Sequence, residues 1–380
     1  MSSVQQNLKN VNINKWINLL QSNATSTTII KLFSYSIIIV IIIFIVVYGI
    51  RIMNRNKSNC DKLKKMYKRF PKLSSITPTS HTYNLRDYYI KTAYNACSAG
   101  QQKNDFVNVC GLKNAIKQGA RCLDFEIYSL NDKPVIAVSN VNNFYTKGSY
   151  NSIPFEDAIT IISNYAFSNG SCPNPNDPLL LNFRIMSNNK PIYDIMAKTL
   201  YSKLQTKLLD KQYSYEYKGK NLSSEPIKNL IGKVIIIVDG TNPLYKETPL
   251  DEYVNITSGS VFLRSYVFSQ IKNIQDFNEL VQFNKQNMTI VSPDKSSYVA
   301  NPSSALAMTY GCQFVAMALQ KKDSNLDYYN KLFEDQNSAF ILKPEKLRYV
   351  PVTIPTPSPP DPQLSYAQRT VQSDFYKFNM

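Results

Sequence analysis

The chain has 380 residues, enough for one large α/β domain of about 250 residues with further segments at its ends. Its 43 Lys and Arg residues outnumber 27 Asp and Glu, and the net charge of +16 favours an anionic neighbour, either nucleic acid or an anionic membrane face. The sequence lacks zinc-ligand spacing and a Gly-rich phosphate loop, so specific nucleic-acid binding has no support. The six cysteines lack paired spacing, which predicts reduced thiols rather than a disulfide framework or a metal site.

The N-terminal part contains one strongly apolar stretch. Residues 1–31 are polar and carry no acidic residue, whereas residues 32–50 carry no charge and are rich in isoleucine. Nineteen helical residues reach about 28 Å, enough to cross the hydrocarbon core of a bilayer. We therefore expect a single transmembrane helix over 32–50, followed by a basic juxtamembrane linker over 51–86.

Basic residues are distributed unevenly around this stretch. Residues 51–72 contain nine Lys or Arg and one acid, while residues 1–31 contain three Lys. The positive-inside rule then predicts that the N-terminus lies outside or in a lumen and that the large C-terminal part is cytoplasmic. The densest run is expected either to hold anionic lipid headgroups or only to stop transfer; it comprises Lys62, Lys64, Lys65, Lys68 and Arg69.

Residues 87–349 alternate short apolar runs with helical patterns, which favours parallel strands in an α/β barrel. The stretch 247–258 lacks clear periodicity and is expected to join two half-barrels. Strands are predicted at 121–128, 135–139, 179–185, 233–239, 260–264, 288–292, 313–319 and 340–342. Helices are predicted at 110–118, 155–167, 192–209, 274–283 and 326–333.

The C-terminal tail, residues 350–380, begins with a proline-rich stretch that predicts an extended arm. Its last residues include four aromatic side chains, which suit docking onto a protein partner, although a disordered end is the simpler expectation.

Asp124 and Glu126 are the first candidate functional residues. They are two residues apart on a predicted buried strand, so both carboxylates point to the same face. Two like charges buried together need a cation between them, a basic neighbour or access to solvent. The residue types alone leave these readings open.

The surrounding sequence resembles the catalytic domain of phosphoinositide-specific phospholipase C. Residues 119–126 and 133–138 are similar to its GCRCLELD and EPVIYHG segments, and 153–167 to its F-x-D-V-I…YAF helix. Residues 179–184 resemble VILSLE, while 311–320 and 340–345 resemble GCQ-V-ALNFQ and GYVLKPE. Motifs of both the X and Y halves occur in order, so the resemblance implies a phospholipase C-like TIM-type barrel, preceded here by the transmembrane helix.

The resemblance also implies a chemistry. Two histidines of the family move protons, and calcium held by an Asn and three carboxylates activates the inositol hydroxyl. The first histidine position falls on Tyr94, with Asn95 keeping the calcium-ligand position; alternatively, the family's SHNTY motif aligns with Ser80–Tyr83 and the first histidine is His81. The second histidine position is Val138 under either alignment.

Further positions depart from the pattern. Asp124 and Glu126 keep two carboxylate positions, but the third is Arg184, whose guanidinium is expected to occupy the cation site or pair with them. Of the phosphate-gripping lysines, Lys233 remains, whereas Ile237 and Asp239 replace the later ones. The segment at Ser296 resembles the SSNY motif without its upstream Arg.

The resemblance therefore implies a membrane-anchored phospholipase C-like protein that has lost the phosphodiesterase reaction and needs no cofactor. It would act as a scaffold or lipid-headgroup-binding module, similar to degenerate relatives encoded by large DNA viruses, with its tail linking a membrane to a capsid. The alternative is an active phosphodiesterase in which Asn95, Asp124 and Glu126 hold calcium or another metal, and Tyr94 or His81 moves the proton.

Overall fold

The computed structural model describes residues 26–144, 146–351, 357–358 and 367–380. Residues 1–348 and 349–380 are two separate units. The polar segment 1–25 and most of the proline-rich stretch lie outside the described residues.

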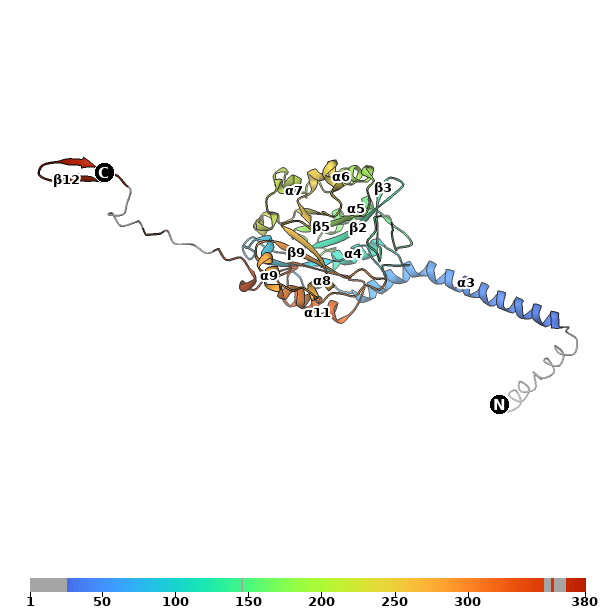
Figure 1. Cartoon of the computed structure of the whole chain (residues 1–380). Coiled ribbons are helices and arrows are strands. Elements are labelled where there is room, and N and C mark those ends of the chain that lie inside the picture. The colour runs from blue at the N-terminus through green and yellow to red at the C-terminus, as the bar shows by residue number, and fades with distance from the viewer. Residues whose placement is uncertain (1–25, 145, 352–356, 359–366) are drawn as a thin grey trace. The chain divides into compact units, whose positions relative to one another are not determined.

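The main unit contains a curled sheet surrounded by helices (Figure 1). Its eight parallel strands are hydrogen-bonded in the order β7-β6-β5-β2-β1-β10-β9-β8, and β7 and β8 follow each other in the chain, so the barrel is nearly closed. The predicted phospholipase C-like TIM-type barrel is confirmed. The eight strands are β1 (Tyr88–Ala93), β2 (Cys122–Leu130), β5 (Leu179–Ile185), β6 (Val234–Asp239), β7 (Ile256–Ser258), β8 (Leu263–Val267), β9 (Met288–Ser292) and β10 (Phe314–Met317).

Three more strands pair antiparallel at the barrel's margin: β3 (Lys133–Ala137) on β2, β4 (Ile153–Pro154) on β3, and β11 (Phe340–Leu342) on β1. The helices around the barrel are α4 (Val109–Lys117), α5 (Phe155–Tyr165), α6 (Lys190–Leu204), α8 (Phe268–Lys272), α9 (Phe277–Gln286), α10 (Ser304–Thr309) and α11 (Ser324–Asp335). The segment α7 (Ser214–Lys218) is a left-handed turn, because its central residues have φ between 51° and 54°. Short 3₁₀ helices are η1 (Leu85–Asp87), η2 (Lys211–Tyr213), η3 (Leu222–Ser224), η4 (Ile227–Leu230), η5 (Pro243–Glu247), η6 (Pro249–Tyr253) and η7 (Glu345–Leu347).

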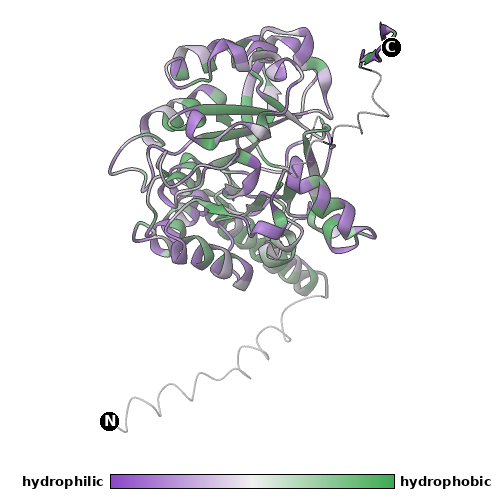
Figure 2. Cartoon of the chain, turned by 90° about the vertical axis from the view of Figure 1, so that its left-hand side faces the viewer, coloured by the Kyte–Doolittle hydropathy of each residue, from purple (hydrophilic) through white to green (hydrophobic). Residues whose placement is uncertain are grey.

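Burial explains why these segments form a barrel. Residues on both faces of β2, β5 and β6 are almost wholly buried, one set packing into the barrel and the other against helices. Figure 2 shows hydrophobic colour along the strands and hydrophilic colour on many of the surrounding helices. Gly119, at a φ of 72°, lets the chain turn from α4 into β2, a conformation that glycine adopts without steric cost.

Two of the parallel barrel strands were not predicted. β1 is buried on both faces and contains Lys91 and Thr92, so its sequence has no clean apolar run. β7 has three residues and lies in the stretch expected to be a connection. The predicted helix at 274–283 corresponds to α9, which begins three residues later because Asp276 caps it by accepting a bond from the Glu279 N–H. The short helix α8 was not predicted.

The apolar N-terminal stretch lies in a much longer helix, α3 (Ser26–Met66), which is long and apolar enough to cross a membrane. Residues 51–66, expected to begin a linker, continue this helix. Its last turns pack on the barrel: Asn59 and Leu63 are buried, as is Tyr67 just beyond it, at the spacing of one helical face. The many basic residues of this segment made its single buried face difficult to recognise in the sequence.

One cysteine expectation was wrong. Cys60 in α3 and Cys110 in α4 form a disulfide, although 50 residues separate them in the chain. Their pairing depends on α3 lying against α4, which no sequence spacing signals. The other four cysteines are free, and all four are buried.

The C-terminal unit also differs from expectation. Strands β12 (Thr370–Gln372) and β13 (Lys377–Asn379) form an antiparallel hairpin, so the end of the chain is ordered locally. The ring centroids of Tyr376 and Phe378 are 5.6 Å apart, and this aromatic contact supports the hairpin.

Lys91 in β1 is a buried amine whose Nζ has no hydrogen-bond partner among the described residues. Burial lowers the pKa of Lys91 to about 8, and its Nζ lies 5.9 Å from the centroid of the Phe333 ring of α11. Replacing Lys91 with methionine should stabilise the barrel by roughly 1–3 kcal/mol at pH 7, because it removes a desolvated charge. Denaturant unfolding of the detergent-solubilised full chain measures the change.

The sign of the pH dependence follows from the lowered pKa. Below pH 8 the amine is protonated in both folded and unfolded states, so the cost of burial is complete. That cost declines as pH rises, and is absent above the unfolded pKa of about 10.4. The gain should therefore shrink between pH 8 and 10, whereas exposed Lys331→Met should change little at any pH. A pH-independent gain contradicts this account.

Candidate functional site

The register between β2 and β5 builds the centre of the site. Asp124 is paired with Asn182, and Glu126 with Arg184, so these four side chains lie on the same side of two neighbouring parallel strands. Asp124 and Glu126 are buried almost completely. Side chains in this arrangement must satisfy each other because little water reaches them.

Arg184 binds both carboxylates. Its Nε and Nη2 donate to the two oxygens of Asp124 at 2.8 and 2.6 Å, and its Nη1 donates to Glu126 at 2.8 Å. Nη2 also donates to Asn95 Oδ1 at 2.9 Å. The guanidinium stacks near the Tyr94 ring, with 5.1 Å between Cζ and the ring centroid. This planar fork binds at least one oxygen of each of Asn95, Asp124 and Glu126.

Sequence reasoning missed a second cation, Lys295. Its Nζ forms an ion pair with Glu126 and donates to the Ser139 carbonyl at 3.2 Å. Lys295 lies in the loop after β9, next to Ser296 of the segment that resembles the SSNY motif. Nothing in its local sequence indicated that its side chain contacts β2. Glu126 also accepts bonds from the Tyr128 hydroxyl at 2.9 Å and the Ser139 N–H at 3.0 Å.

The charges of the cluster balance: two carboxylates face two basic side chains. Burial disfavours the ionised form of Glu126, but Arg184 and Lys295 outweigh it and hold the pKa of Glu126 below its usual range. The same carboxylates raise the pKa of Arg184 despite its burial. Glu126 and Arg184 therefore stay ionised and paired at neutral pH.

The residues at the family's histidine positions offer no proton carrier. Val138 is buried in the core beside Ser139. Burial raises the pKa of Tyr94 far above neutrality, so its hydroxyl holds its proton. His81 lies before β1, at the other end of the strand from Asn95, where Ser80 Oγ is 2.6 Å from Nδ1. The structure thus places Tyr94, and not His81, in the site.

A calcium ion does not match these residues. Calcium requires six to eight oxygen ligands, several of them carboxylates. Here Asn95, Asp124 and Glu126 supply oxygens, but all three already bind Arg184, which stands where the resemblance implies a third carboxylate. Within the described ranges, no group of three His, Cys, Asp or Glu side chains is arranged to hold a metal.

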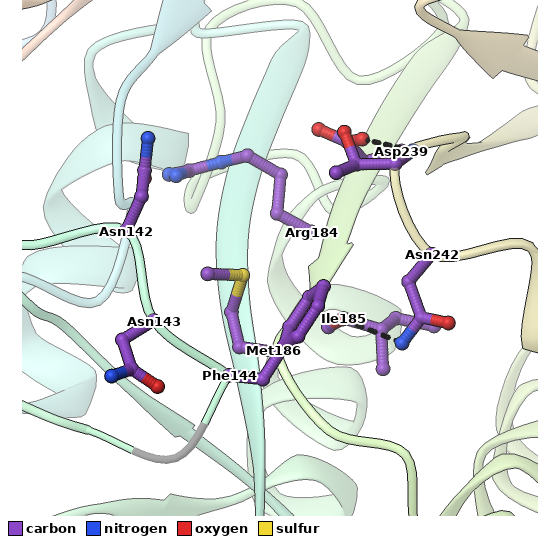
Figure 3. Close-up of a pocket in the computed structure, with 9 residues that line it drawn as sticks. Asn142, Asn143, Phe144, Arg184, Ile185, Met186, Asp239 and Asn242 are labelled. Carbon is purple, nitrogen blue, oxygen red and sulfur yellow. Dashed lines mark hydrogen bonds between the residues drawn. The ribbon is translucent and has the colours of Figure 1, made fainter.

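A pocket of about 290 Å³ opens beside the cluster. Figure 3 shows the Arg184 guanidinium reaching toward Asn142, with Met186 and the Phe144 ring below it and Asp239 at the upper edge. Asp239 accepts a bond from the Thr241 N–H at 2.7 Å. Lys233, by contrast, precedes β6 at the opposite end of the barrel and pairs with Asp210 at 3.5 Å. The pocket therefore lacks the family's phosphate-gripping lysines.

The five basic residues predicted to contact lipid are exposed at the end of α3 and just beyond it. Lys62 is twelve residues past Ile50, which corresponds to about 18 Å of helical rise. That separation exceeds the Debye length of about 8 Å at physiological salt. Arg51 and Lys57 are also exposed and lie nearer to the apolar stretch.

Comparison with known families gives two matches. Residues 81–239 match the phosphatidylinositol-specific phospholipase C X domain, and residues 254–346 match the Y domain of the same family. Together they cover well over half of the chain. The site cluster draws residues from both: Arg184 from the first and Lys295 from the second.

Individual relatives are more distant. A 113-residue segment, 30% of this chain and 12% of the relative, is 26% identical to 1-phosphatidylinositol 4,5-bisphosphate phosphodiesterase 1 of Saccharomyces cerevisiae. The crystal structure of L. pealei PLC21 superposes with a TM-score of 0.57 at 18% identity, covering 71% of this chain and 38% of that one. S. officinalis PLC21 gives 0.55 at 18% identity, with the same coverage. The chain thus spans much less than half the length of these proteins, and the structural likeness shows the fold.

Proposed function

This chain belongs to the phosphatidylinositol-specific phospholipase C family, and from that premise we propose that it is a membrane-anchored, non-catalytic member. In this role it binds lipid headgroups or serves as a scaffold and does not hydrolyse phosphodiesters.

One observation carries the proposal: the Arg184 guanidinium bonds to Asp124, Glu126 and Asn95 together. A metal entering this site would have to displace a buried, ion-paired arginine. Losing a proton-transferring imidazole typically costs about 10²–10⁴-fold in rate, and Val138 cannot replace one. The arginine in the cation position and the valine in place of an imidazole both impair the same phosphodiesterase reaction.

The test is hydrolysis by the full chain in micelles containing phosphatidylinositol. With calcium, magnesium or manganese, we expect no release of inositol phosphate above that of Asp124→Asn, a variant of the same shape. A bound calcium ion would stabilise the fold and raise the melting temperature. We expect calcium to leave the melting temperature of the wild type unchanged. Metal-dependent turnover that Asp124→Asn abolishes would sink the proposal.

A gain-of-binding variant provides the matched positive control. Arg184→Glu combined with Val138→His restores the family residues at both positions. We expect calcium to raise the melting temperature of this variant, because three carboxylates and Asn95 then surround one cavity. Isothermal titration calorimetry reports the binding directly.

The alternative is an active metal-dependent phosphodiesterase acting on phosphoinositides. The convergence of Asn95, Asp124 and Glu126 around the Arg184 guanidinium favours it. It requires Arg184 to leave these oxygens and Tyr94 to exchange a proton despite its raised pKa. Calcium is a cofactor only under this alternative.

We further propose a single-pass location, with the barrel on the cytoplasmic side as the basic flank favours. The disulfide is typical of oxidising compartments and favours the opposite side, so the redox state of Cys60 in cells discriminates the two orientations. Because of the distance along α3, Arg51 and Lys57 supply the nearer contacts to anionic headgroups. The basic run ending at Arg69 reaches lipid only where α3 leaves the bilayer at a shallow angle.

We also propose a protein partner for the C-terminal part of the chain. The aromatic hairpin at the C-terminus suits docking on a protein, and the proline-rich stretch before it suits a spacer. Together with the Asn-, Ile- and Lys-rich composition, this organisation is consistent with a component that links an internal membrane to the capsid of a large DNA virus. A specific nucleic-acid partner is not proposed.

A further inference from the structure

The end of α3 and the segment after it border a groove on the barrel. The apolar part of α3 leads to the barrel at the face that carries the site, where Arg55 Nη1 donates to the Asn104 carbonyl, in the loop after β1, at 2.7 Å. The helix ends near the opposite face, where Lys117, the last residue of α4 before β2, donates to the Tyr67 carbonyl at 2.9 Å. The groove lies at this second face, between residues 65–72 and α11, and has a volume of about 760 Å³.

The segment that borders the groove is fixed at both ends. The Lys117 ammonium also donates to the Lys68 carbonyl at 3.3 Å and lies 5.4 Å from the centroid of the Phe70 ring. Further on, the Ser74 N–H donates to the Asn337 carbonyl at 2.8 Å. These contacts hold the backbone of the segment in place, so the groove is formed before a ligand binds. A preformed site lowers the entropic cost of binding.

Basic side chains predominate in the lining of this groove. Its charged residues are Lys65, Lys68, Arg69, Lys72, Glu334 and Asp335. Asp335 is paired with Lys331 at 3.1 Å, which leaves four cations against the Glu334 carboxylate. Among the described residues, none of these four cations forms an ion pair with a carboxylate. Exposed cations alone indicate only a solvated basic surface, so a ligand site needs support from buried groups as well.

Two buried polar atoms in the groove supply this support. Gln118 is 4% exposed, and its Nε2 has no hydrogen-bond partner among the described residues. Asn330 donates to the Tyr67 hydroxyl, while its buried Oδ1 has no partner in the same part of the chain. Both side chains line the groove. Folded proteins rarely leave such atoms unpaired, because a buried polar group without a partner is costly. The two atoms therefore indicate a ligand that accepts one hydrogen bond and donates another.

We propose that this groove binds a phosphate ester whose alcohol part carries a free hydroxyl group. The guanidinium of Arg69 and the ammonium of Lys68 match the charge and the acceptor oxygens of a phosphate. Gln118 Nε2 donates to a phosphate oxygen, and Asn330 Oδ1 accepts from the hydroxyl. The inference goes beyond the proposed function, because the groove lies on the opposite face from Arg184 and needs no membrane anchor. The phosphate ester is either a soluble molecule or a lipid headgroup, and the experiment distinguishes these two sources.

The test uses the full chain reconstituted in phosphatidylcholine nanodiscs, so that α3 is already embedded in lipid. Isothermal titration calorimetry with glycerol 3-phosphate examines the soluble source, and glycerol is the probe that lacks phosphate. Co-sedimentation with large vesicles of phosphatidylcholine and phosphatidylglycerol examines the lipid source. Gln118→Met removes the buried donor at similar side-chain length, and Lys68→Gln with Arg69→Gln removes two charges. Lys321→Gln with Lys322→Gln is the matched control, because both lysines are exposed and lie outside the groove.

We expect the wild type to bind at least one of the two phosphate probes and not to bind glycerol. Gln118→Met and the double variant at 68 and 69 should each weaken that binding by about tenfold or more, whereas the control at 321 and 322 should bind like the wild type. No binding of either phosphate probe, or the same affinity in all variants, overturns the proposal, as does an equal loss in the control. The surface double variant keeps the test decisive if Gln118→Met fails to fold. No hydrolysis is measured, so the result is independent of whether the barrel is catalytic.

Discussion

Replacing Arg184 with alanine is expected to lower the free energy of unfolding by about 3–5 kcal/mol, because two buried carboxylates lose the cation that pairs them. Asp124 is 3% exposed and Glu126 is fully buried at the side chain, so water cannot take over this role. Denaturant unfolding of the detergent-solubilised full chain at pH 7 measures the loss. The free energy of unfolding of Arg184→Lys should lie between those of the wild type and Arg184→Ala, since an ammonium cannot hold three groups in one plane.

The pH dependence separates this ion pairing from simple loss of packing. Burial opposes ionisation of Glu126, yet Arg184 and Lys295 depress its pKa, so its contribution is fully present above the unfolded value of about 4.3 and is lost as pH falls through the lower folded pKa. The gap between wild type and Arg184→Ala should therefore narrow in acid below about pH 4.

Arg264 provides a matched control for this experiment. It also binds a carboxylate through two nitrogens, at 2.8 and 2.7 Å, but Glu279 is half exposed. Arg264→Ala should cost less than about 1 kcal/mol, as is usual for surface ion pairs. Equal losses for Arg184→Ala and Arg264→Ala would refute the view that burial makes the Arg184 cluster special.

Removing the disulfide should have a comparable effect. Replacing both Cys60 and Cys110 with serine is expected to cost about 4 kcal/mol in the chain-entropy account, since the bond closes a loop across a sequence separation of 50 residues. Unfolding curves with and without reductant measure it. The apolar contacts of Leu63 and Tyr67 should keep the helix docked at low denaturant.

Reductant supplies the control. It should reproduce the loss in the wild type and leave the double serine variant unchanged, because the remaining cysteines are free and buried. A wild-type curve insensitive to reductant would mean that the bond contributes nothing to stability. Alkylation of cellular protein before lysis then shows whether Cys60 is oxidised in its own compartment.

Site residues that lie in short motifs could be predicted from the sequence, whereas contacts between distant segments could not. The spacing of Asp124 and Glu126 placed them on one face, and the family pattern drew attention to Arg184, since all three lie in short recognisable motifs. Lys295 escaped notice because 169 residues separate it from Glu126 and only the barrel's closure brings them together. β1 was missed as a strand because a buried lysine breaks its apolar pattern.

The sequence by itself determined the alternation of strands and helices, the apolar N-terminal stretch and the valine at the second family histidine position, because these are properties of local pattern and residue identity. The tertiary structure alone decided that Arg184 and Lys295 neutralise the carboxylates, that Cys60 meets Cys110, and that α3 leaves the barrel from its site face. Each of these outcomes depends on which distant segments become neighbours. The packing of the whole barrel decides which distant segments become neighbours, and no local sequence pattern encodes this choice.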